Sequence, residues 1–179
     1  KQASPTSPIG TKSNTTPRGS YLDALSPLTV TLGVQNVSFV AQAVDWIPES
    51  LFQILTAAYR HRGFSFVRIL QRCPEFVGNM FEPWVHDPQR MLMLTHADGI
   101  RVSPALQKIY RNQLPHDPAD INRAREIASS DDPIPVGILY RNPEVPCYED
   151  LRGAGKLRTA DQVRGALDGE LDKFTVWPQ

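Results

Sequence analysis

The apolar and polar positions between residues 37 and 70 predict a strand, a helix and a second strand. Residues 37–44 (VSFVAQAV) are rich in β-branched and aromatic side chains, and residues 63–70 (GFSFVRIL) form a nearly continuous apolar run. Both patterns are typical of buried strands. Strand, helix and strand joined by short connections form a βαβ unit, in which the two strands run parallel. Because helices normally cover both faces of such a sheet, we expect an α/β fold with a mostly parallel sheet covered by helices.

The helix between the two strands begins near Pro48, which suits a first helical turn, and ends before Gly63. Its apolar residues recur with helical spacing, which predicts one buried face. We expect Leu51, Leu55 and Tyr59 to face the sheet.

Farther along the chain the pattern predicts fewer elements. Residues 118–129 (PADINRAREIAS) predict a helix with Asp117 as its N-cap. Residues 134–140 (IPVGILY) predict a strand, in which Pro135 requires an edge position or the strand start. Residues 91–94 (MLML) fit a short strand or a buried helical turn, and residues 160–171 predict a polar surface helix. Residues 74–89 show no regular pattern.

The first twenty residues are polar. Fourteen of them are Ser, Thr, Pro, Gly or Asn, and the only charged side chains among them are the basic Lys1, Lys12 and Arg18. Such a segment favours a disordered terminus, because it buries too little apolar surface to offset its ordering entropy. A loop rich in hydroxyl groups can also line an anion site. The composition leaves both interpretations open.

Charge and composition exclude several classes of function. Nineteen basic residues balance nineteen acidic ones, so no net field attracts nucleic acid or an anionic membrane. No apolar stretch is long enough to span a bilayer. Two cysteines, Cys73 and Cys147, are too few for a disulfide framework, which favours a cytoplasmic protein.

Cys73 is the residue with the strongest chemical context. It follows the second predicted strand directly, at the carboxyl end where open α/β sheets place their sites, and it precedes Pro74. Cys-Pro is a recurring context of iron–sulfur ligands. The alternative is a packed thiol in a turn. If Cys73 is a ligand, its partner ligands lie outside this chain. The four histidines lack metal-ligand spacing, and His61 fits a cation at a helix end.

Three blocks of the chain resemble the β subunits of 2-oxoacid:ferredoxin oxidoreductases. Gln2-Ala3-Ser4-Pro5-Thr6, with Gly10 and Thr15-Thr16-Pro17 after it, is similar to the family's Q-x-S-P-T…T-T-P stretch. Residues 39–41, 63–66 and Cys73-Pro74 are similar to the next block, and residues 132–138 to a C-terminal strand. The resemblance is dense over residues 1–74, resumes near 131–143, and is weak elsewhere.

The resemblance implies an enzyme that binds thiamine diphosphate and Mg²⁺ and is built from an α and a β subunit. Such an enzyme decarboxylates a 2-oxoacid oxidatively, forms an acyl-CoA from coenzyme A, and passes electrons through a [4Fe-4S] cluster to ferredoxin. The resemblance favours 2-oxoglutarate as the 2-oxoacid. It implies that Cys73 is a cluster ligand and that Gln2, Ser4 and Thr6 lie beside the cofactor and the substrate. No catalytic residue is assigned.

The same resemblance implies that the thiamine-diphosphate-binding fold is incomplete here. The family's diphosphate and Mg²⁺ motif and its other cluster cysteines lie upstream of the position that matches Lys1. We therefore expect the C-terminal part of a β subunit, inactive alone. Its expected parts are a cofactor-proximal loop (1–20), an α/β region (21–143) and a C-terminal extension with a surface helix (144–179). The family's frequent arginine after the strand alanine is Gln42 here. The alternative is a non-enzymatic α/β interaction module.

Overall fold

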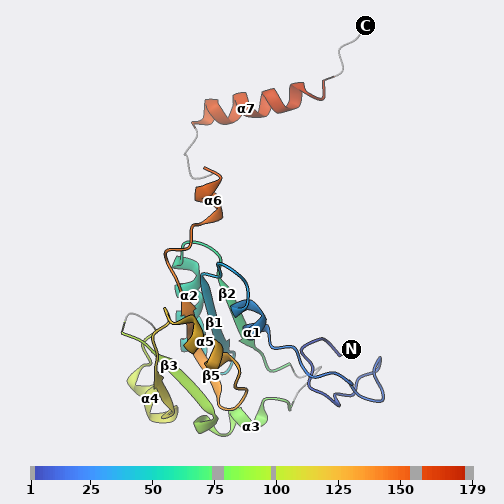
Figure 1. Ribbon diagram of the computed structural model, residues 1–179, viewed down its shortest axis with the longest axis vertical. Coiled ribbons are helices and arrows are strands. Elements are labelled where there is room, and N and C mark those ends of the chain that lie inside the picture. Colours follow the sequence, from blue (N-terminus) through green and yellow to red (C-terminus); the bar gives the residue numbers. More distant parts are fainter. Residues whose placement is uncertain (1–2, 74–78, 98–99, 154–158, 176–179) are drawn as a thin grey trace. The chain divides into compact units, whose positions relative to one another are not determined.

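The computed structural model describes residues 3–73, 79–97, 100–153 and 159–175. The chain divides into two units, residues 1–145 and 146–179. The first unit holds a five-stranded sheet with the strand order β2-β1-β5-β3-β4 (Figure 1). The strands are β1 (Phe39–Val44), β2 (Phe66–Leu70), β3 (Met91–Thr95), β4 (Gln113–Pro115) and β5 (Ile134–Arg141).

The sheet is mostly parallel, as the sequence predicts. Strand β1 pairs with β2 in parallel, and β3 pairs in parallel with both β4 and β5. The one antiparallel pairing joins β1 to β5. The carboxyl ends of β1 and β2 therefore lie at the same edge of the sheet as the first residues of β5.

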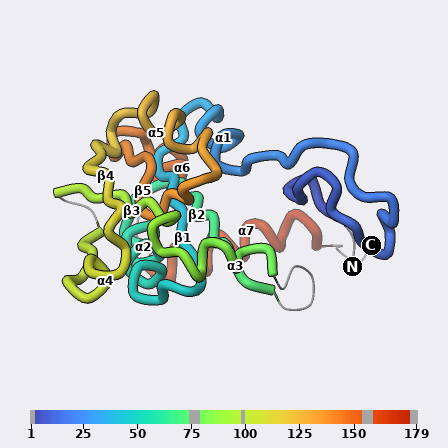
Figure 2. The backbone as a smooth tube through the Cα atoms, turned by 90° about the horizontal axis from the view of Figure 1, so that it is seen from below, coloured from blue at the N-terminus to red at the C-terminus, as the bar shows by residue number. Residues whose placement is uncertain are grey.

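Helices cover both faces of this sheet. Helix α2 (Pro48–Arg60) lies on one face, and helices α1 (Pro27–Leu32) and α5 (Ile121–Ala128) lie on the other, with the strands between them (Figure 2). Two buried apolar clusters follow this division. One joins Phe39 and Ile54 on the α2 side, and the other joins Leu32, Val40 and Ile127 on the α1 and α5 side. The predicted doubly covered α/β sheet is confirmed.

Shorter helices complete the first unit. They are α3 (Glu82–Val85), the 3₁₀ helix η1 (Pro88–Arg90) and α4 (Pro104–Ile109). The second unit contains α6 (Tyr148–Leu151) and α7 (Ala160–Asp172), which has no buried residue and begins with a capping box at Thr159. Helix α7 confirms the predicted polar surface helix. None of the helices in the described ranges is long and apolar enough to cross a bilayer.

The prediction for the buried face of α2 is wrong at two of its three positions. Leu51 packs against the core, but Leu55 is 43% exposed and Tyr59 is 90% exposed. The buried positions are Ser50 and Ile54. The small Ala57 and Ala58 also pack against the core, whereas the larger Phe52 and Tyr59 are exposed, so the face with the largest side chains is not the face that is buried.

Several predicted boundaries also shift. Strand β2 begins at Phe66 rather than Gly63, and residues 91–94 belong to strand β3. Helix α5 begins at Ile121, and its N-cap is Asp120 rather than Asp117. The Asp117 carboxylate instead accepts a hydrogen bond from the Ala119 backbone N–H at 2.9 Å. Both aspartates suit a helix start, so composition alone favours neither.

Strand β5 lies between β1 and β3, and two of its residues depend on that position. Pro135 is its second residue, which confirms a strand start. Gly137 has φ +139°, and a Cβ atom there would lie 2.8 Å from the Leu94 Cβ of β3. The β1–β5 register shifts next to this glycine, between Val40 and Ala41. A side chain at position 137 would therefore push β5 and β3 apart.

The two faces of α2 lead to a stability prediction. Ile54→Ala should lower the free energy of unfolding by about 2–5 kcal/mol, because it leaves a cavity in the core. Tyr59→Ala should change it by less than about 0.5 kcal/mol. Urea denaturation followed by circular dichroism measures both. Equal destabilisation by the two substitutions would contradict the observed face.

Candidate functional site

A cleft of about 920 Å³ lies between the N-terminal segment and one edge of the sheet. Ser4, Thr6 and Lys12 line it from the N-terminal side. Gln42 of β1, Arg68 of β2 and Pro135 of β5 line it from the sheet. Because β5 runs antiparallel to β1, its first residues lie at the edge where β1 and β2 end. All three strands therefore contribute to the wall of the cleft.

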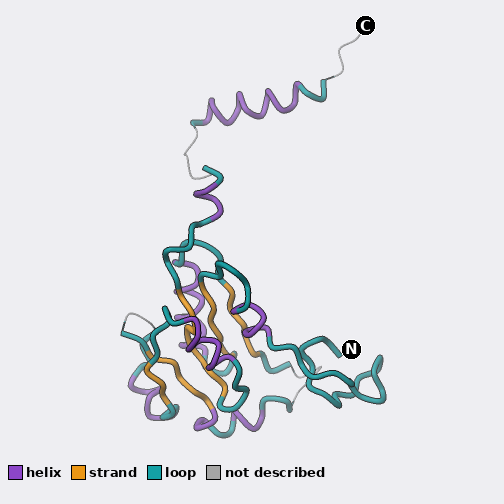
Figure 3. The backbone as a smooth tube through the Cα atoms, viewed as in Figure 1, coloured by secondary structure: helices purple, strands orange, loops and turns teal. Residues whose placement is uncertain are grey.

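The N-terminal segment has its own backbone hydrogen bonds. Figure 3 shows residues 3–25 as loop throughout. The Gly10 N–H donates to the Ser20 carbonyl at 2.8 Å, and the Ser20 N–H donates to the Thr11 carbonyl at 3.0 Å. The Leu25 N–H donates to the Pro5 carbonyl at 2.8 Å, which ties the segment to the start of α1. These bonds hold the segment in a series of turns beside the cleft.

Glycine is required where the two arms of this loop meet. Gly19 has φ +91°, and a Cβ atom there would lie 2.9 Å from the Gly10 carbonyl oxygen. Any larger residue at position 19 would separate the arms, and it would also be strained at that φ.

Ser4 and Thr6 form a small hydroxyl cluster at the cleft. The Ser4 Oγ lies 3.0 Å from the Thr6 Oγ1 and 3.3 Å from the Ser7 Oγ. Hydroxyl groups both donate and accept hydrogen bonds, so this cluster can bind either kind of polar ligand atom. The third predicted loop residue, Gln2, lies outside the described residues.

An aromatic group forms a further part of the cleft wall. Phe81 and Trp84 line the cleft, and Phe81 stacks between Trp46 and Trp84 at ring distances of 5.6 and 6.2 Å. Trp84 is fixed by Asp132, whose Oδ1 accepts its indole N–H at 3.3 Å. Asp132 also accepts hydrogen bonds from Arg90, which hold the pKa of the Asp132 carboxyl below its ordinary value. No periodic pattern predicts this group, because Trp46 and Phe81 lie outside the helices and strands and Trp84 lies in the four-residue helix α3.

Cys73 lies just beyond the carboxyl end of β2 and is a free, half-buried thiol. The preceding Arg72 is held to the end of β1, since its backbone N–H and its Nε donate to Asp45 at 3.2 and 3.1 Å. This contact fixes the chain where Cys73 leaves the sheet. Among the residues that the structure describes, no group of three or more metal-binding side chains is present.

Cys147 has a different environment in the second unit. Its thiol donates a hydrogen bond to the Glu149 carboxylate at 2.6 Å. Cys73 and Cys147 belong to different units of the chain.

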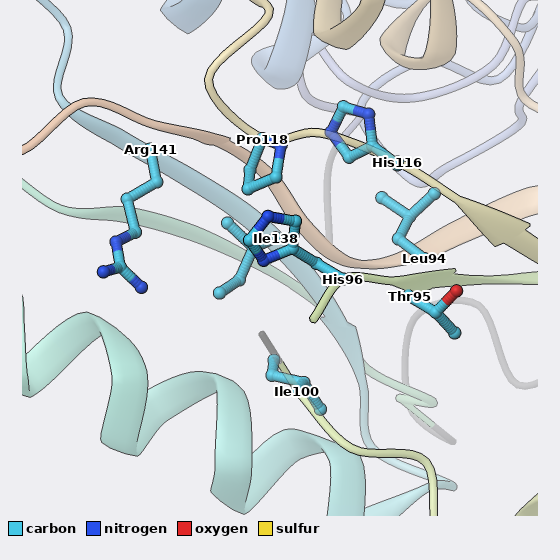
Figure 4. A pocket seen from close by; sticks show the side chains of 8 residues that line it. All are labelled: Leu94, Thr95, His96, Ile100, His116, Pro118, Ile138 and Arg141. Carbon is cyan, nitrogen blue, oxygen red and sulfur yellow. The ribbon is translucent and has the colours of Figure 1, made fainter. Parts of the chain in front are cut away.

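Two of the histidines come together at the opposite edge of the sheet. His96 and His116 line a cavity of about 10 Å³ with Arg141 and Ile138 (Figure 4). The His116 Nε2 donates to the Leu139 carbonyl at 2.6 Å, and its ring is buried. A cavity of this size has room for about one water molecule. We therefore assign His116 a structural role.

The prediction that His61 is a cation at a helix end is wrong. Its ring stacks on Phe39 at 5.3 Å. Burial, followed by the nearby Arg141, lowers the pKa of His61 below its ordinary value, so the neutral form is favoured. His61 lines a second cavity, of about 780 Å³, together with Arg60, Arg62 and Arg141.

Comparisons with known proteins find similar chains among the β subunits of one group of oxidoreductases. The model for the C-terminal region of the pyruvate ferredoxin oxidoreductase β subunit matches residues 105–155. A 2-oxoacid:ferredoxin oxidoreductase β subunit from a Sulfolobus species is 29% identical over 154 residues, which are 83% of this chain and 46% of that protein. The chain is similar to the C-terminal part of 2-oxoacid:ferredoxin oxidoreductase β subunits.

Further matches agree with this assignment. The 2-oxoglutarate oxidoreductase subunit KorB of Mycobacterium tuberculosis is 35% identical over 101 residues, which are 55% of this chain and 27% of that protein. The chain spans about half the length of several β-subunit relatives that it matches. The family model falls largely on residues 105–130 and 144–155, where the resemblance in sequence motifs is weak.

A solved structure shares the fold. The 2-oxoglutarate:ferredoxin oxidoreductase of Magnetococcus marinus, solved with 2-oxoglutarate, coenzyme A and succinyl-CoA bound, superposes with a TM-score of 0.63 at 24% identity. The match covers 93% of this chain and 52% of that chain. At this identity the match supports the fold of the β-subunit family.

The environment of His61 leads to a pH prediction. The folded state disfavours protonated His61 relative to the unfolded chain, so the unfolded chain binds more protons below about pH 6.5. Stability should therefore fall as the pH is lowered from about 6.5 towards the pKa of folded His61.

His61→Phe should lose this part of the pH dependence. Urea denaturation at several pH values between about 5 and 8 compares the variant with the wild type. Identical pH profiles for the two proteins would contradict the assignment of a neutral, partly buried ring.

Proposed function

We propose that this chain is the cofactor-facing C-terminal part of a β subunit in a 2-oxoacid:ferredoxin oxidoreductase. One observation carries the proposal. The sheet edge at which β2 ends carries the cleft that Ser4 and Thr6 line, and Cys73 follows that same strand end. Two separate sequence blocks therefore lead to the same edge: the block with Ser4 and Thr6 predicts contact with a cofactor, and the block with Cys73 predicts a cluster ligand.

The overall reaction under this proposal consumes a 2-oxoacid, coenzyme A and two oxidised ferredoxins. It yields an acyl-CoA, CO₂, two reduced ferredoxins and a proton, so the two electrons released on loss of CO₂ are passed on singly. 2-Oxoglutarate is the favoured substrate, and its product is succinyl-CoA. The partners under this proposal are an α subunit and ferredoxin.

The residues at the cleft fit the reactive end of thiamine diphosphate. Gln42 is 2% exposed, and its Oε1 has no hydrogen-bond partner among the described residues. An orphaned buried acceptor beside a hydroxyl cluster is typical of a ligand site. Bound there, thiamine diphosphate would supply the electron sink for loss of CO₂. Ser4 and Thr6 would orient the ligand, and Phe81 and Trp84 would exclude water from it.

Cys73 fits one position of a [4Fe-4S] cluster. A half-buried thiol at a fixed strand end can bind iron and shield it from solvent. Under this proposal the remaining thiolate ligands and the Mg²⁺ and diphosphate motif come from outside this chain. The cluster would take electrons from the cofactor and pass them to ferredoxin.

The first test concerns Cys73, in the complex of this β subunit with its α subunit. Cys73→Ser should lower the iron content and abolish the signal of the reduced cluster in electron paramagnetic resonance, because one of four thiolates is lost. Ferredoxin reduction should fall, whereas release of CO₂ from the bound 2-oxoacid should be partly retained. Cys147→Ser is the matched control and should change neither iron content nor ferredoxin reduction.

Two outcomes would contradict the proposal. Equal iron content and ferredoxin reduction in Cys73→Ser and wild type would make Cys73 a packed thiol. A complex with neither iron nor thiamine diphosphate would instead support the non-enzymatic interaction module.

The second test concerns the N-terminal segment. If Ser4 and Thr6 contact the cofactor, amide hydrogen exchange of residues 3–17 should slow when thiamine diphosphate and Mg²⁺ are added to the complex. Helix α7, which has no buried residue, provides the internal control and should exchange at an unchanged rate. No added protection of residues 3–17 would contradict their place at the cofactor.

A further inference from the structure

A cation and an amide lie side by side on the sheet wall of the cleft. The parallel register pairs Gln42 of β1 with Arg68 of β2, so the two side chains project from the same face of the sheet. Both residues line the cleft. The neighbouring pair on that face, Val40 and Phe66, packs into the cluster formed with α1 and α5. Gln42 and Arg68 therefore interrupt an otherwise apolar surface.

The orientation of the Gln42 amide is fixed by β5. Its Nε2 donates to the Pro135 carbonyl oxygen at 2.8 Å, and a carbonyl oxygen can only accept. The Oε1 is therefore the free acceptor of this buried side chain, and it has no donor among the described residues. A buried acceptor without a donor destabilises the fold unless another group supplies one.

Arg68 is a half-buried cation without an ion pair in the described ranges of the chain. Burial acts to lower the pKa of its guanidinium, and the charge of Asp131, which also lines the cleft, acts in the opposite direction. A guanidinium remains charged at neutral pH, and its planar donors match a carboxylate. Asp131 is exposed and stands within electrostatic range of this cation.

We propose that Arg68 binds a carboxylate of the ligand in the cleft, beside the free Gln42 Oε1. This inference rests on the proposed function and names Arg68 as the residue that would select a dicarboxylic 2-oxoacid over a monocarboxylic one. The carboxylate is the one that survives the reaction. A strong bond to the carboxylate that leaves as CO₂ would stabilise the ground state and slow its loss. A monocarboxylic substrate with an apolar tail would leave Arg68 unpaired in the wall.

The test uses the complex of the β subunit with its α subunit and two substrates of the same chemistry. 2-Oxoglutarate carries a second carboxylate, and 2-oxobutyrate lacks it. Arg68→Met should lower kcat/KM for 2-oxoglutarate about 100-fold, mainly through KM, because a paired and desolvated charge is lost. It should leave kcat/KM for 2-oxobutyrate within about twofold, since that substrate makes no such pair.

Two further variants separate a ligand contact from a structural role. Arg68→Lys keeps the cation and should recover part of the KM for 2-oxoglutarate. Arg101→Met removes an exposed arginine outside the cleft and should change neither substrate. Equal losses for both substrates in Arg68→Met and Arg68→Lys would overturn the proposal.

A binding measurement separates this inference from the proposed function. Isothermal titration calorimetry with glutarate, which cannot be decarboxylated, should give binding to the wild-type complex that Arg68→Met abolishes. Glutarate binding that depends on Arg68 in a complex that oxidises no 2-oxoacid would support the carboxylate site and contradict the oxidoreductase. Oxidation of 2-oxoglutarate by Arg68→Met at an unchanged KM would support the oxidoreductase and contradict the carboxylate site. The inference would also be overturned if Arg68→Met lost thiamine diphosphate binding but still bound glutarate.

Discussion

The pairing of β1 with two different neighbours is the constraint on which the rest of the structure depends. All six residues of β1 are buried, and the strand runs parallel to β2 and antiparallel to β5. These two directions bring the ends of β1 and β2 to the start of β5 at one edge of the sheet. The hydrogen bond from Gln42 to Pro135 joins residues 93 positions apart at that edge. Without the antiparallel pairing, the cleft would lose one of its walls.

The cleft combines groups that have different physical roles. The hydroxyl cluster at Ser4 and Thr6 is exposed and adaptable, whereas Gln42 is fixed within the sheet. A site built on strands holds its groups more precisely than a site built on loops. Under the proposed function, the sheet wall is therefore the part better suited to select a substrate, and the loop is the part better suited to contact a larger cofactor.

Part of the candidate site was predictable from local sequence. Ser4, Thr6 and Cys73 belong to short motifs, so each could be proposed from its neighbours. Arg68 and Trp84 could not be selected in this way. Arg68 lies within an apolar strand pattern and gains a role only when it is paired with Gln42. Trp84 reaches the cleft through its contact with Asp132, 48 residues away. No local pattern encodes such a contact, because the partner is chosen by the packing of distant segments.

The sequence by itself determined the βαβ unit, the α/β class, the strand at residues 134–140 and the surface helix near residues 160–171. These follow from side-chain periodicity and from Pro and Gly positions, which act within a few residues. Only the tertiary structure decided which face of α2 is buried and which way β5 runs. Helix α2 carries apolar residues on more than one face, and the face with Ser50 and Ile54 packs on the sheet while Phe52 and Tyr59 stay exposed. The direction of a strand depends on its pairing partners, and partners far apart along the chain leave no local signal.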